Sequence, residues 1–156
     1  MIRNIEGSLP PEFGQLSNLS KLELHEFNNG SIPPEFGNLA NLEDLFLAGD
    51  IKGPIPSEIG KLSNLKVIND LNSIPPEIGQ LSNLSNLAIR GKWKGSIPPE
   101  IGKLSNLEKL TIEGDELISI PSEIGQLSKL NELILNVKEL GSIPPEIGNL
   151  SNLENL

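Results

Sequence analysis

Residues 97–104 read Ile-Pro-Pro-Glu-Ile-Gly-Lys-Leu, and close copies of this octapeptide recur along the whole chain. Five of the six steps between successive copies span 23 residues, and one step spans 19 residues. A period in this range is typical of a solenoid, in which each repeat is a small structural unit stacked on its neighbours. The copies begin at Leu9, Ile32, Ile55, Ile74, Ile97, Ile120 and Ile143.

The first half of each repeat predicts a short strand. In the repeat from Leu107 to Leu130, one polar residue separates Leu110 from Ile112, which is the alternation of a half-buried strand. The chain returns to this place after a full circuit, so strands of successive repeats should lie parallel, about 4.8 Å apart. Their inward-facing leucine and isoleucine side chains would then stack into one continuous core.

The second half of each repeat predicts a short 3-10 or irregular helical turn. Proline stands where such a turn begins, glutamate follows in the first turn, and glycine stands where the turn ends. The Ser-Asn-Leu that follows, as at residues 63–65, is typical of a turn capped by side chains. We therefore expect a single α/β-type solenoid over residues 1–156, with about six to seven repeats. Its parallel sheet would form the concave face and its short turns the convex face.

The composition disfavours several classes of partner. The 156 residues carry 12 Lys and Arg against 21 Asp and Glu, and this net charge of −9 argues against nucleic acid. No run of 18 apolar residues is present, so membrane insertion is not expected. The absence of cysteine excludes disulfides, thiolate metal sites and thiol nucleophiles. Residues 1–6 lack the pattern of a secretion signal, and an extracellular or cell-surface location and a cytoplasmic one both stay open.

The pattern L-x-x-L-x-L-x-x-N-x-L-x-x-I-P resembles that of the leucine-rich repeat family, and the resemblance covers the whole chain. The wording Gly-Ser-Ile-Pro-Pro-Glu-Ile-Gly-Asn-Leu-Ser-Asn-Leu at residues 141–153 is most similar to plant-type receptor repeats. The 23-residue spacing instead resembles the repeats of intracellular Ras-group and Roco-type proteins. The resemblance implies the solenoid fold and a binding role without a cofactor, but it names no partner, because the family binds many unrelated ones.

The chain departs from the family at the asparagine that follows each strand. In the family, this amide bonds the backbone of adjacent turns, and here only Asn4 keeps the residue type. Lysine and phenylalanine cannot replace such a ladder, so we expect water or shifted turns to satisfy the backbone there. The other equivalent places hold Phe27, Asp50, Lys92, Asp115 and Lys138.

The repeat at residues 65–74 lacks four residues, which predicts a tighter loop at Asn69 and Asp70 and a kink between its neighbours. Neither end of the sequence shows a recognisable cap. Open parallel edges favour end-to-end stacking, so self-association is one expectation, and a fragment of a longer solenoid is another.

The residues that alternate with the buried leucines should form the concave surface, which is the usual binding face of the family. The less polar row Phe46, Ala88, Thr111 and Ile134 would be the apolar centre of an interface with a charged rim. The alternative is an ordinary solvated sheet face with a few apolar side chains. The candidate binding residues are Glu23, His25, Asp44, Phe46, Ala88, Arg90, Lys109, Thr111, Glu113, Glu132, Ile134 and Asn136.

Two single residues admit more than one interpretation. Trp93, between two lysines in a loop, is a candidate interaction anchor, and the interpretation that we favour is that it fills the gap left by a missing leucine. His25 shares a strand face with Glu23. One histidine and one carboxylate are too few for a metal site, so no metal is expected.

Two further sets of residues recur with the repeat. A glutamate in each octapeptide should serve its own helical turn, with a cation-binding row as the less favoured alternative. These residues are Glu12, Glu35, Glu58, Glu77, Glu100, Glu123 and Glu146. Asn-x-Ser sequons would be glycosylation acceptors in a secreted eukaryotic protein, or else by-products of the repeated wording. They lie at Asn18, Asn29, Asn83 and Asn149.

The sequence as a whole favours a non-catalytic module that binds a protein or peptide on its concave sheet, as part of a receptor or scaffold. The alternative is a structural protein whose repeats associate into filaments or a surface layer. An enzyme is disfavoured, because the chain has one histidine and lacks a phosphate-binding loop, a nucleophile elbow and a metal motif.

Overall fold

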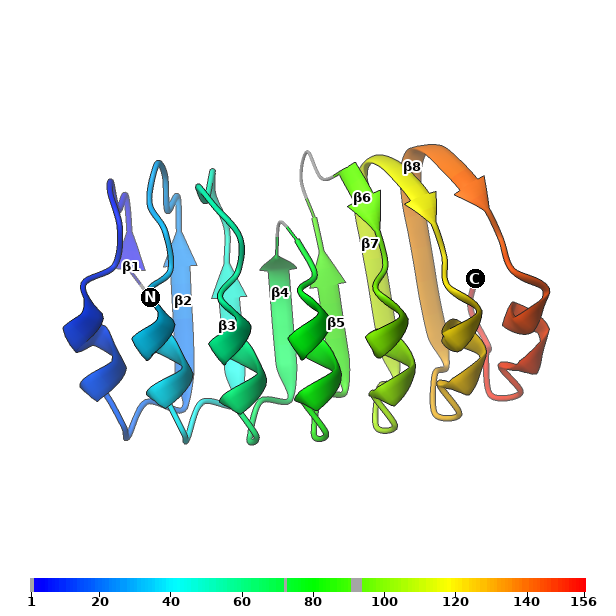
Figure 1. Ribbon diagram of the computed structural model, residues 1–156, viewed down its shortest axis with the longest axis horizontal. Coiled ribbons are helices and arrows are strands. Elements are labelled where there is room, and N and C mark those ends of the chain that lie inside the picture. Colours follow the sequence, from blue (N-terminus) through cyan, green and yellow to red (C-terminus); the bar gives the residue numbers. More distant parts are fainter. Residues whose placement is uncertain (1, 72, 91–93) are drawn as a thin grey trace.

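The computed structural model describes residues 2–71, 73–90 and 94–156, which form a parallel sheet with a row of 3-10 helices along its other side (Figure 1). The strands are β1 (Ile2–Arg3), β2 (Lys21–His25), β3 (Asp44–Leu47), β4 (Val67–Leu71), β5 (Asn86–Ile89), β6 (Lys94–Ser96), β7 (Lys109–Ser119) and β8 (Glu132–Ser142). The helices are η1 (Pro11–Gln15), η2 (Pro34–Asn38), η3 (Ser57–Lys61), η4 (Pro76–Gln80), η5 (Pro99–Lys103), η6 (Ser122–Gln126) and η7 (Pro145–Asn149). The predicted solenoid fold is confirmed.

The sheet pairs equivalent residues of successive repeats. Its strand order is β1-β2-β3-β4-β5-β7-β6, with β8 also paired to β7, and all of these pairs are parallel. Leu22 pairs with Leu45 and Leu45 with Ile68, while Leu110 links Leu87 to Leu133 farther along. All six side chains are buried. Burying each one contributes about 1.5–3 kcal/mol, and no repeat can bury its own without a neighbour.

The helices follow the proline-glutamate-glycine wording of the octapeptide. Before η5, Pro98 is extended with φ −69° and ψ 147°, and Glu100 stands in the first turn. The helix closes with a hydrogen bond of 3.1 Å from the Leu104 N–H to the Ile101 carbonyl, and the Ile101 side chain is fully buried. The seven helices stack side by side in one row (Figure 1).

The glycine of the octapeptide has another role than the one we predicted. Gly102 lies inside η5 rather than ending it, and it touches the next repeat. A Cβ atom at Gly102 would lie 2.7 Å from the Glu123 carbonyl oxygen, and Gly37, Gly79 and Gly125 meet the following glutamate in the same way. The glycine therefore lets neighbouring helices approach closely, which is a packing requirement rather than a helix stop.

We predict that Gly102→Ala destabilises the fold by about 1–3 kcal/mol, because the added methyl group would push two helices apart. Gly148→Ala is the matched control, since a Cβ atom there meets nothing within 4 Å. Urea denaturation of both variants measures the difference. Equal stabilities for the two variants would contradict the packing role.

Backbone groups bond directly across repeats where the family asparagine is missing. The Phe27 N–H donates to the Ala48 carbonyl at 3.0 Å, and the Asn29 N–H donates to the Asp50 carbonyl at 3.0 Å. Asp115 and Lys138 form an ion pair of 2.6 Å between neighbouring strands. Direct bonds between repeats therefore satisfy two of the backbone groups at these places, and a role for water or shifted turns at the others stays a prediction. Lys92 lies outside the described residues.

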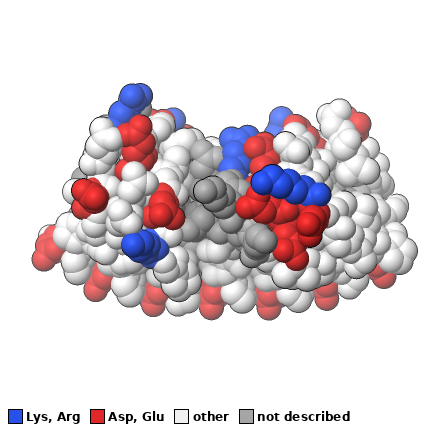
Figure 2. Space-filling view, turned by 90° about the horizontal axis from the view of Figure 1, so that it is seen from above, with Lys and Arg blue, Asp and Glu red and all other residues white. Residues whose placement is uncertain are grey.

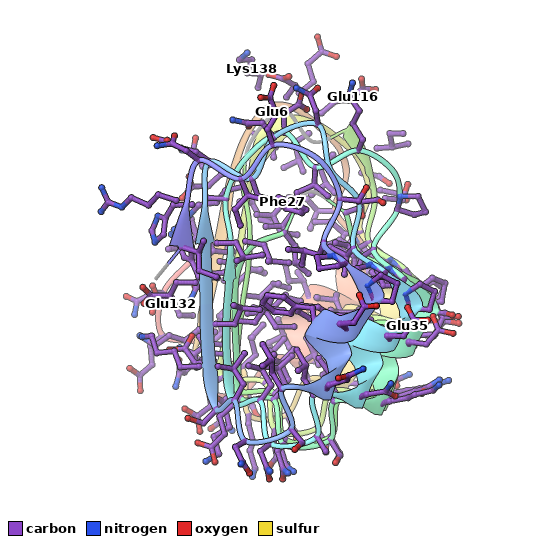
Figure 3. All side chains as sticks on the ribbon, turned by 90° about the vertical axis from the view of Figure 1, so that its left-hand side faces the viewer. Glu6, Phe27, Glu35, Glu116, Glu132 and Lys138 are labelled. Atoms are coloured by element: carbon purple, nitrogen blue, oxygen red, sulfur yellow. The ribbon has the colours of Figure 1, made fainter. Side chains whose placement is uncertain are left out.

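Phe27, at one of the places where the family has asparagine, belongs to the core. Its side chain is fully buried in the interior of the solenoid (Figure 3). A Cβ atom on Gly30 would collide with the Phe27 ring, whereas a Cβ atom on Gly49 would collide with the Phe27 backbone. Glycine is therefore required at Gly30, where the backbone passes close to the ring, and at Gly49, where two backbone segments meet and φ is 146°.

We predict that Phe27→Asn, which restores the family residue, destabilises the fold by about 3–5 kcal/mol through lost burial. Lys138→Asn at the equivalent place should change stability little, because Lys138 is 78% exposed and exposed ion pairs contribute little. Thermal or urea unfolding distinguishes the two variants. A stabilising Phe27→Asn would show that the asparagine ladder is still available to this chain.

The shortened repeat keeps its strand and bends it. β4 includes both Asn69 and Asp70, where we had predicted a loop, and the buried Leu71 pairs with Ile89. The register shifts between Ile68 and Leu71, so β4 carries an extra residue opposite β5. A bulge of this kind locally disrupts the ladder and increases the twist. The predicted irregularity is therefore present, but within a strand.

We predict that amides of β4 exchange at least about tenfold faster than those of β7, because interrupted ladders open more readily. β3 and β4 pair at three positions, whereas β7 and β8 pair at nine. Native-state hydrogen exchange resolved by mass spectrometry or NMR gives the comparison. Uniform protection along the sheet would rule out a weak junction here.

The last repeats extend the sheet beyond the concave face. β7 and β8 each run for 11 residues and continue past the concave face over the upper edge (Figure 1), where β6 pairs with β7. The two long strands stay in register from Lys109 opposite Glu132 to Ser119 opposite Ser142. The turns expected between strand and helix are thus replaced by strand in this part of the chain.

Candidate functional site

The side chains of the concave face lie in three rows set by the register of the strands. All twelve candidate binding residues lie on this face, and Figure 3 shows Glu132 on the sheet side and Glu35 on the opposite, helix side. The first row contains Lys21, Asp44, Val67, Asn86, Lys109 and Glu132. The middle row contains Glu23, Phe46, Asn69, Ala88, Thr111 and Ile134. The third row includes His25, Arg90, Glu113 and Asn136.

Ion pairs link neighbouring strands on both sides of the middle row. Lys21 contacts Asp44 and Glu23 at 3.0 Å each, and Lys109 contacts Glu132 at 2.9 Å. The hydrogen bonds that the two lysines donate to these carboxylates raise the pKa of both lysines, and the Lys21 hydrogen bond lowers the pKa of Glu23. The remaining pairs are Lys66–Glu43 at 2.9 Å and Arg90–Glu113 at 3.3 Å. The cations of these pairs are therefore already neutralised by the protein.

The side chains of the middle row are largely uncharged and differ in their exposure to solvent. Phe46 is half-buried and packs against His25, with ring centroids 4.5 Å apart and planes tilted by 30°. Ile134 is 37% exposed, whereas Ala88 is 6% exposed. Ala88 thus lies at the floor of the row, and we had expected it to be a contact residue. Asn69 also belongs to this row, and sequence reasoning missed it because the shortened repeat had suggested a loop there.

His25 has no metal-binding environment. Its Nε2 atom lies 3.8 Å from a Glu23 carboxylate oxygen, beyond hydrogen-bond range, and it is hidden from solvent without a partner. Among the residues that the structure describes, no group of three or more His, Asp or Glu side chains could hold a metal ion. Trp93, the candidate anchor, lies outside the described residues.

Asparagines in the turns that enter the strands form a ladder that the sequence did not reveal. Asn83 donates its amide to the Ser63 carbonyl at 2.7 Å, and Asn106 donates to the Ser82 carbonyl at 2.7 Å. These bonds join repeats, whereas we had expected local caps. Lys129 replaces one asparagine and bonds Asn106 Oδ1 at 2.6 Å. The ladder explains why asparagine recurs in the Asn-Leu-Ser motif. Glycosylation at Asn18, Asn29, Asn83 and Asn149 stays a prediction.

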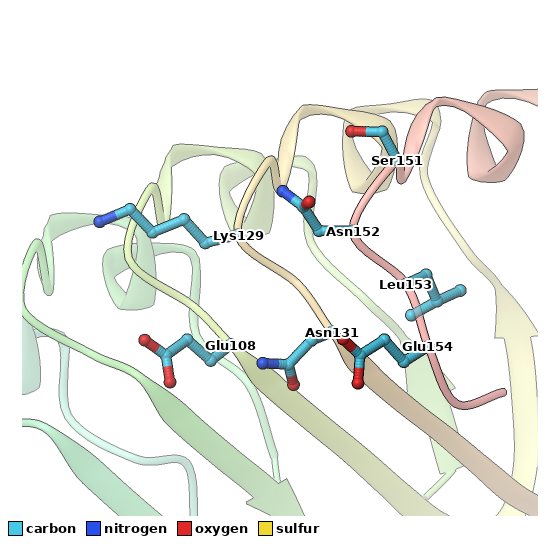
Figure 4. Close-up of a pocket in the computed structure, with 7 residues that line it drawn as sticks. All are labelled: Glu108, Lys129, Asn131, Ser151, Asn152, Leu153 and Glu154. Atoms are coloured by element: carbon cyan, nitrogen blue, oxygen red, sulfur yellow. The ribbon is translucent and has the colours of Figure 1, made fainter.

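A polar pocket of about 440 Å³ lies beside this ladder (Figure 4). The pocket is lined by Glu108, Lys129, Asn131, Ser151, Asn152, Leu153 and Glu154. It lies where the last strands begin, at the edge of the concave face. Carboxylate, ammonium and amide groups are mixed there, so the pocket favours no single charge.

Seen from the edge where the strands end, basic side chains lie directly beside acidic ones, and a line of acidic residues runs along one side (Figure 2). The repeated glutamates lie in the first turns of η1 to η7, on the face opposite the concave sheet. Their placement agrees with a role in each helical turn. Within the described part of the chain, no helix has the length and apolar character needed to cross a membrane.

Comparison with known proteins gives a consistent picture. The sequence model of the leucine-rich repeat region matches residues 74–156. The structure is similar to the plant peptide hormone receptor RGFR1 in complex with RGF2, with a TM-score of 0.76, 32% identity, and coverage of 94% of this chain and 25% of the receptor chain. It is also similar to the ectodomain of the Arabidopsis thaliana receptor kinase GASSHO1/SCHENGEN3, with a TM-score of 0.74, 36% identity, and coverage of 96% and 19%.

Similarity is not restricted to plant proteins. A leucine-rich repeat protein of Leptospira interrogans has a TM-score of 0.61, 32% identity, and coverage of 96% of this chain and 46% of that one. The chain thus spans less than half the length of each of these structures. No curated protein matches the sequence. The family match, which covers more than half of the chain, together with the register and turn geometry described above, shows that the chain belongs to the leucine-rich repeat family.

Proposed function

We propose that the chain is a non-catalytic recognition module that binds a protein or peptide on its concave face. The observation that carries this proposal is the stretch of uncharged side chains from Phe46 to Ile134 in the middle row, with ion pairs on both of its sides. An apolar centre with a polar rim is the usual anatomy of a binding interface.

The similar structures support a peptide as the partner. RGFR1 was solved with RGF2, and the GASSHO1/SCHENGEN3 ectodomain was solved with CASPARIAN STRIP INTEGRITY FACTOR 2. The Arabidopsis receptor kinase HAESA, 34% identical over 94% of this chain, was solved with an IDA peptide hormone. The comparisons offer no comparable support for filaments or a surface layer.

The mechanism of binding follows from the stacked repeats. The parallel ladder fixes the strands, and inter-repeat ion pairs hold the flanking side chains before any partner arrives. A preformed surface loses little conformational entropy on binding, so more of the contact free energy remains as affinity. The module would therefore act as a rigid platform for a flexible ligand.

We predict that Thr111→Lys weakens binding of selected peptides by at least about tenfold, because it places a long cation in the centre of the uncharged row. Peptides would first be selected on the wild-type chain from a random displayed library. Lys103→Glu on η5, on the opposite face, is the control and should leave their affinity unchanged. Peptides that lose affinity with Lys103→Glu but not with Thr111→Lys would move the binding site away from the concave face.

A further inference from the structure

We propose that the concave face takes an extended, uncharged peptide segment that carries two apolar side chains about six residues apart. This inference rests on the proposed binding function and specifies the chemistry of the partner. The two apolar side chains would rest on Phe46 of β3 and on Ile134 of β8, with the segment running across the strands between them.

Phe46 and Ile134 are the two large apolar side chains of the middle row. Three smaller residues lie between them, namely Asn69, Ala88 and Thr111. Ala88 is 6% exposed and Ile134 is 37% exposed, while Phe46 is half-buried, so the row is low at Ala88 and has large apolar side chains on either side of it. A chain laid along the row would therefore find two separate apolar contacts rather than a continuous one.

The separation of the two contacts follows from the strand order. Four steps lead from β3 through β4, β5 and β7 to β8, and at about 4.8 Å per step they span about 19 Å. An extended chain advances about 3.3 Å per residue, so about six residues cover this span. Six is an even number, and side chains separated by an even number of residues point to the same side of an extended chain.

The charges of the face favour an uncharged segment. On one side of the row, Lys21 is held by Asp44 and Lys109 by Glu132; on the other side, Arg90 is held by Glu113. A charged side chain laid along the row would have to compete with these pairs and lose its hydration. An uncharged polar segment has no such cost, and its affinity should depend weakly on salt.

The test is a series of labelled synthetic peptides with a neutral Ser/Thr/Gln background and two leucines separated by four, five, six, seven or eight residues. Affinity is measured by fluorescence polarisation against the whole chain. We expect the six-residue spacing to bind about tenfold more tightly than the five- and seven-residue spacings, since one leucine of those peptides points away from the face. Raising the salt concentration should change the affinity of the six-residue peptide less than twofold.

Two variants of the protein locate the contacts. Phe46→Ser and Ile134→Ser should each reduce the affinity of the six-residue peptide by about tenfold and remove its advantage over a single-leucine peptide. Ile118→Ser is the matched control, because Ile118 is 56% exposed and lies on β7 beyond the concave face. This variant should bind the six-residue peptide with the affinity of the wild type.

The outcomes separate this inference from the broader proposal. Affinity that is independent of leucine spacing, or an unchanged affinity in Phe46→Ser and Ile134→Ser, overturns the two-contact arrangement. If library peptides still lose binding with Thr111→Lys in that case, the recognition function stands without it. Absence of binding by every peptide of the series at millimolar concentration also overturns the inference.

Discussion

Close contact between neighbouring repeats is the constraint on which the rest of the structure depends. On the helix side, a glycine such as Gly102 lies directly against the glutamate carbonyl of the next repeat. On the other side, parallel strands stack equivalent leucines, so that Leu45 lies beside Leu22 and Ile68. Since no repeat can bury its own apolar residues, both contacts must persist for any repeat to be folded. The same stacking also fixes where every concave side chain stands.

The repeat predicted the parallel sheet, the short helices and the buried leucines, because spacing along the sequence maps directly onto position in a stacked repeat. It did not predict what depends on contacts between repeats. The Phe27 ring is buried against Gly30, and the Phe27 backbone lies against Gly49, but neither glycine belongs to the repeated octapeptide. The length of β7 and β8 likewise depends on each strand finding a partner of matching length.

For the candidate site as well, the sequence predicted positions but not contacts between repeats. The alternation along each strand placed all twelve candidate residues on the concave face, but not their exposure or their partners. Ala88 was expected to be a contact residue and is nearly buried, while Asn69 was missed because a four-residue deletion obscured the strand. The ion pairs could not be foreseen from one repeat, because each cation finds a carboxylate on the neighbouring strand.

Exposed ion pairs of this kind contribute little to stability, so their main effect here is on the character of the surface. They neutralise charges beside the uncharged side chains that run from Phe46 to Ile134. The asparagine ladder joins neighbouring repeats at the turns that lead into the strands, as where Asn83 bonds the Ser63 carbonyl. Together these bonds hold the strands and their outward side chains in one arrangement.

A crystal structure of the chain with a peptide selected from a random library tests the central claim most directly. The account predicts an extended peptide lying across β3 to β8 along the middle row, with the protein strands in the positions described here. A peptide bound on the helices, or a sheet rearranged around the ligand, would contradict a preformed concave recognition surface.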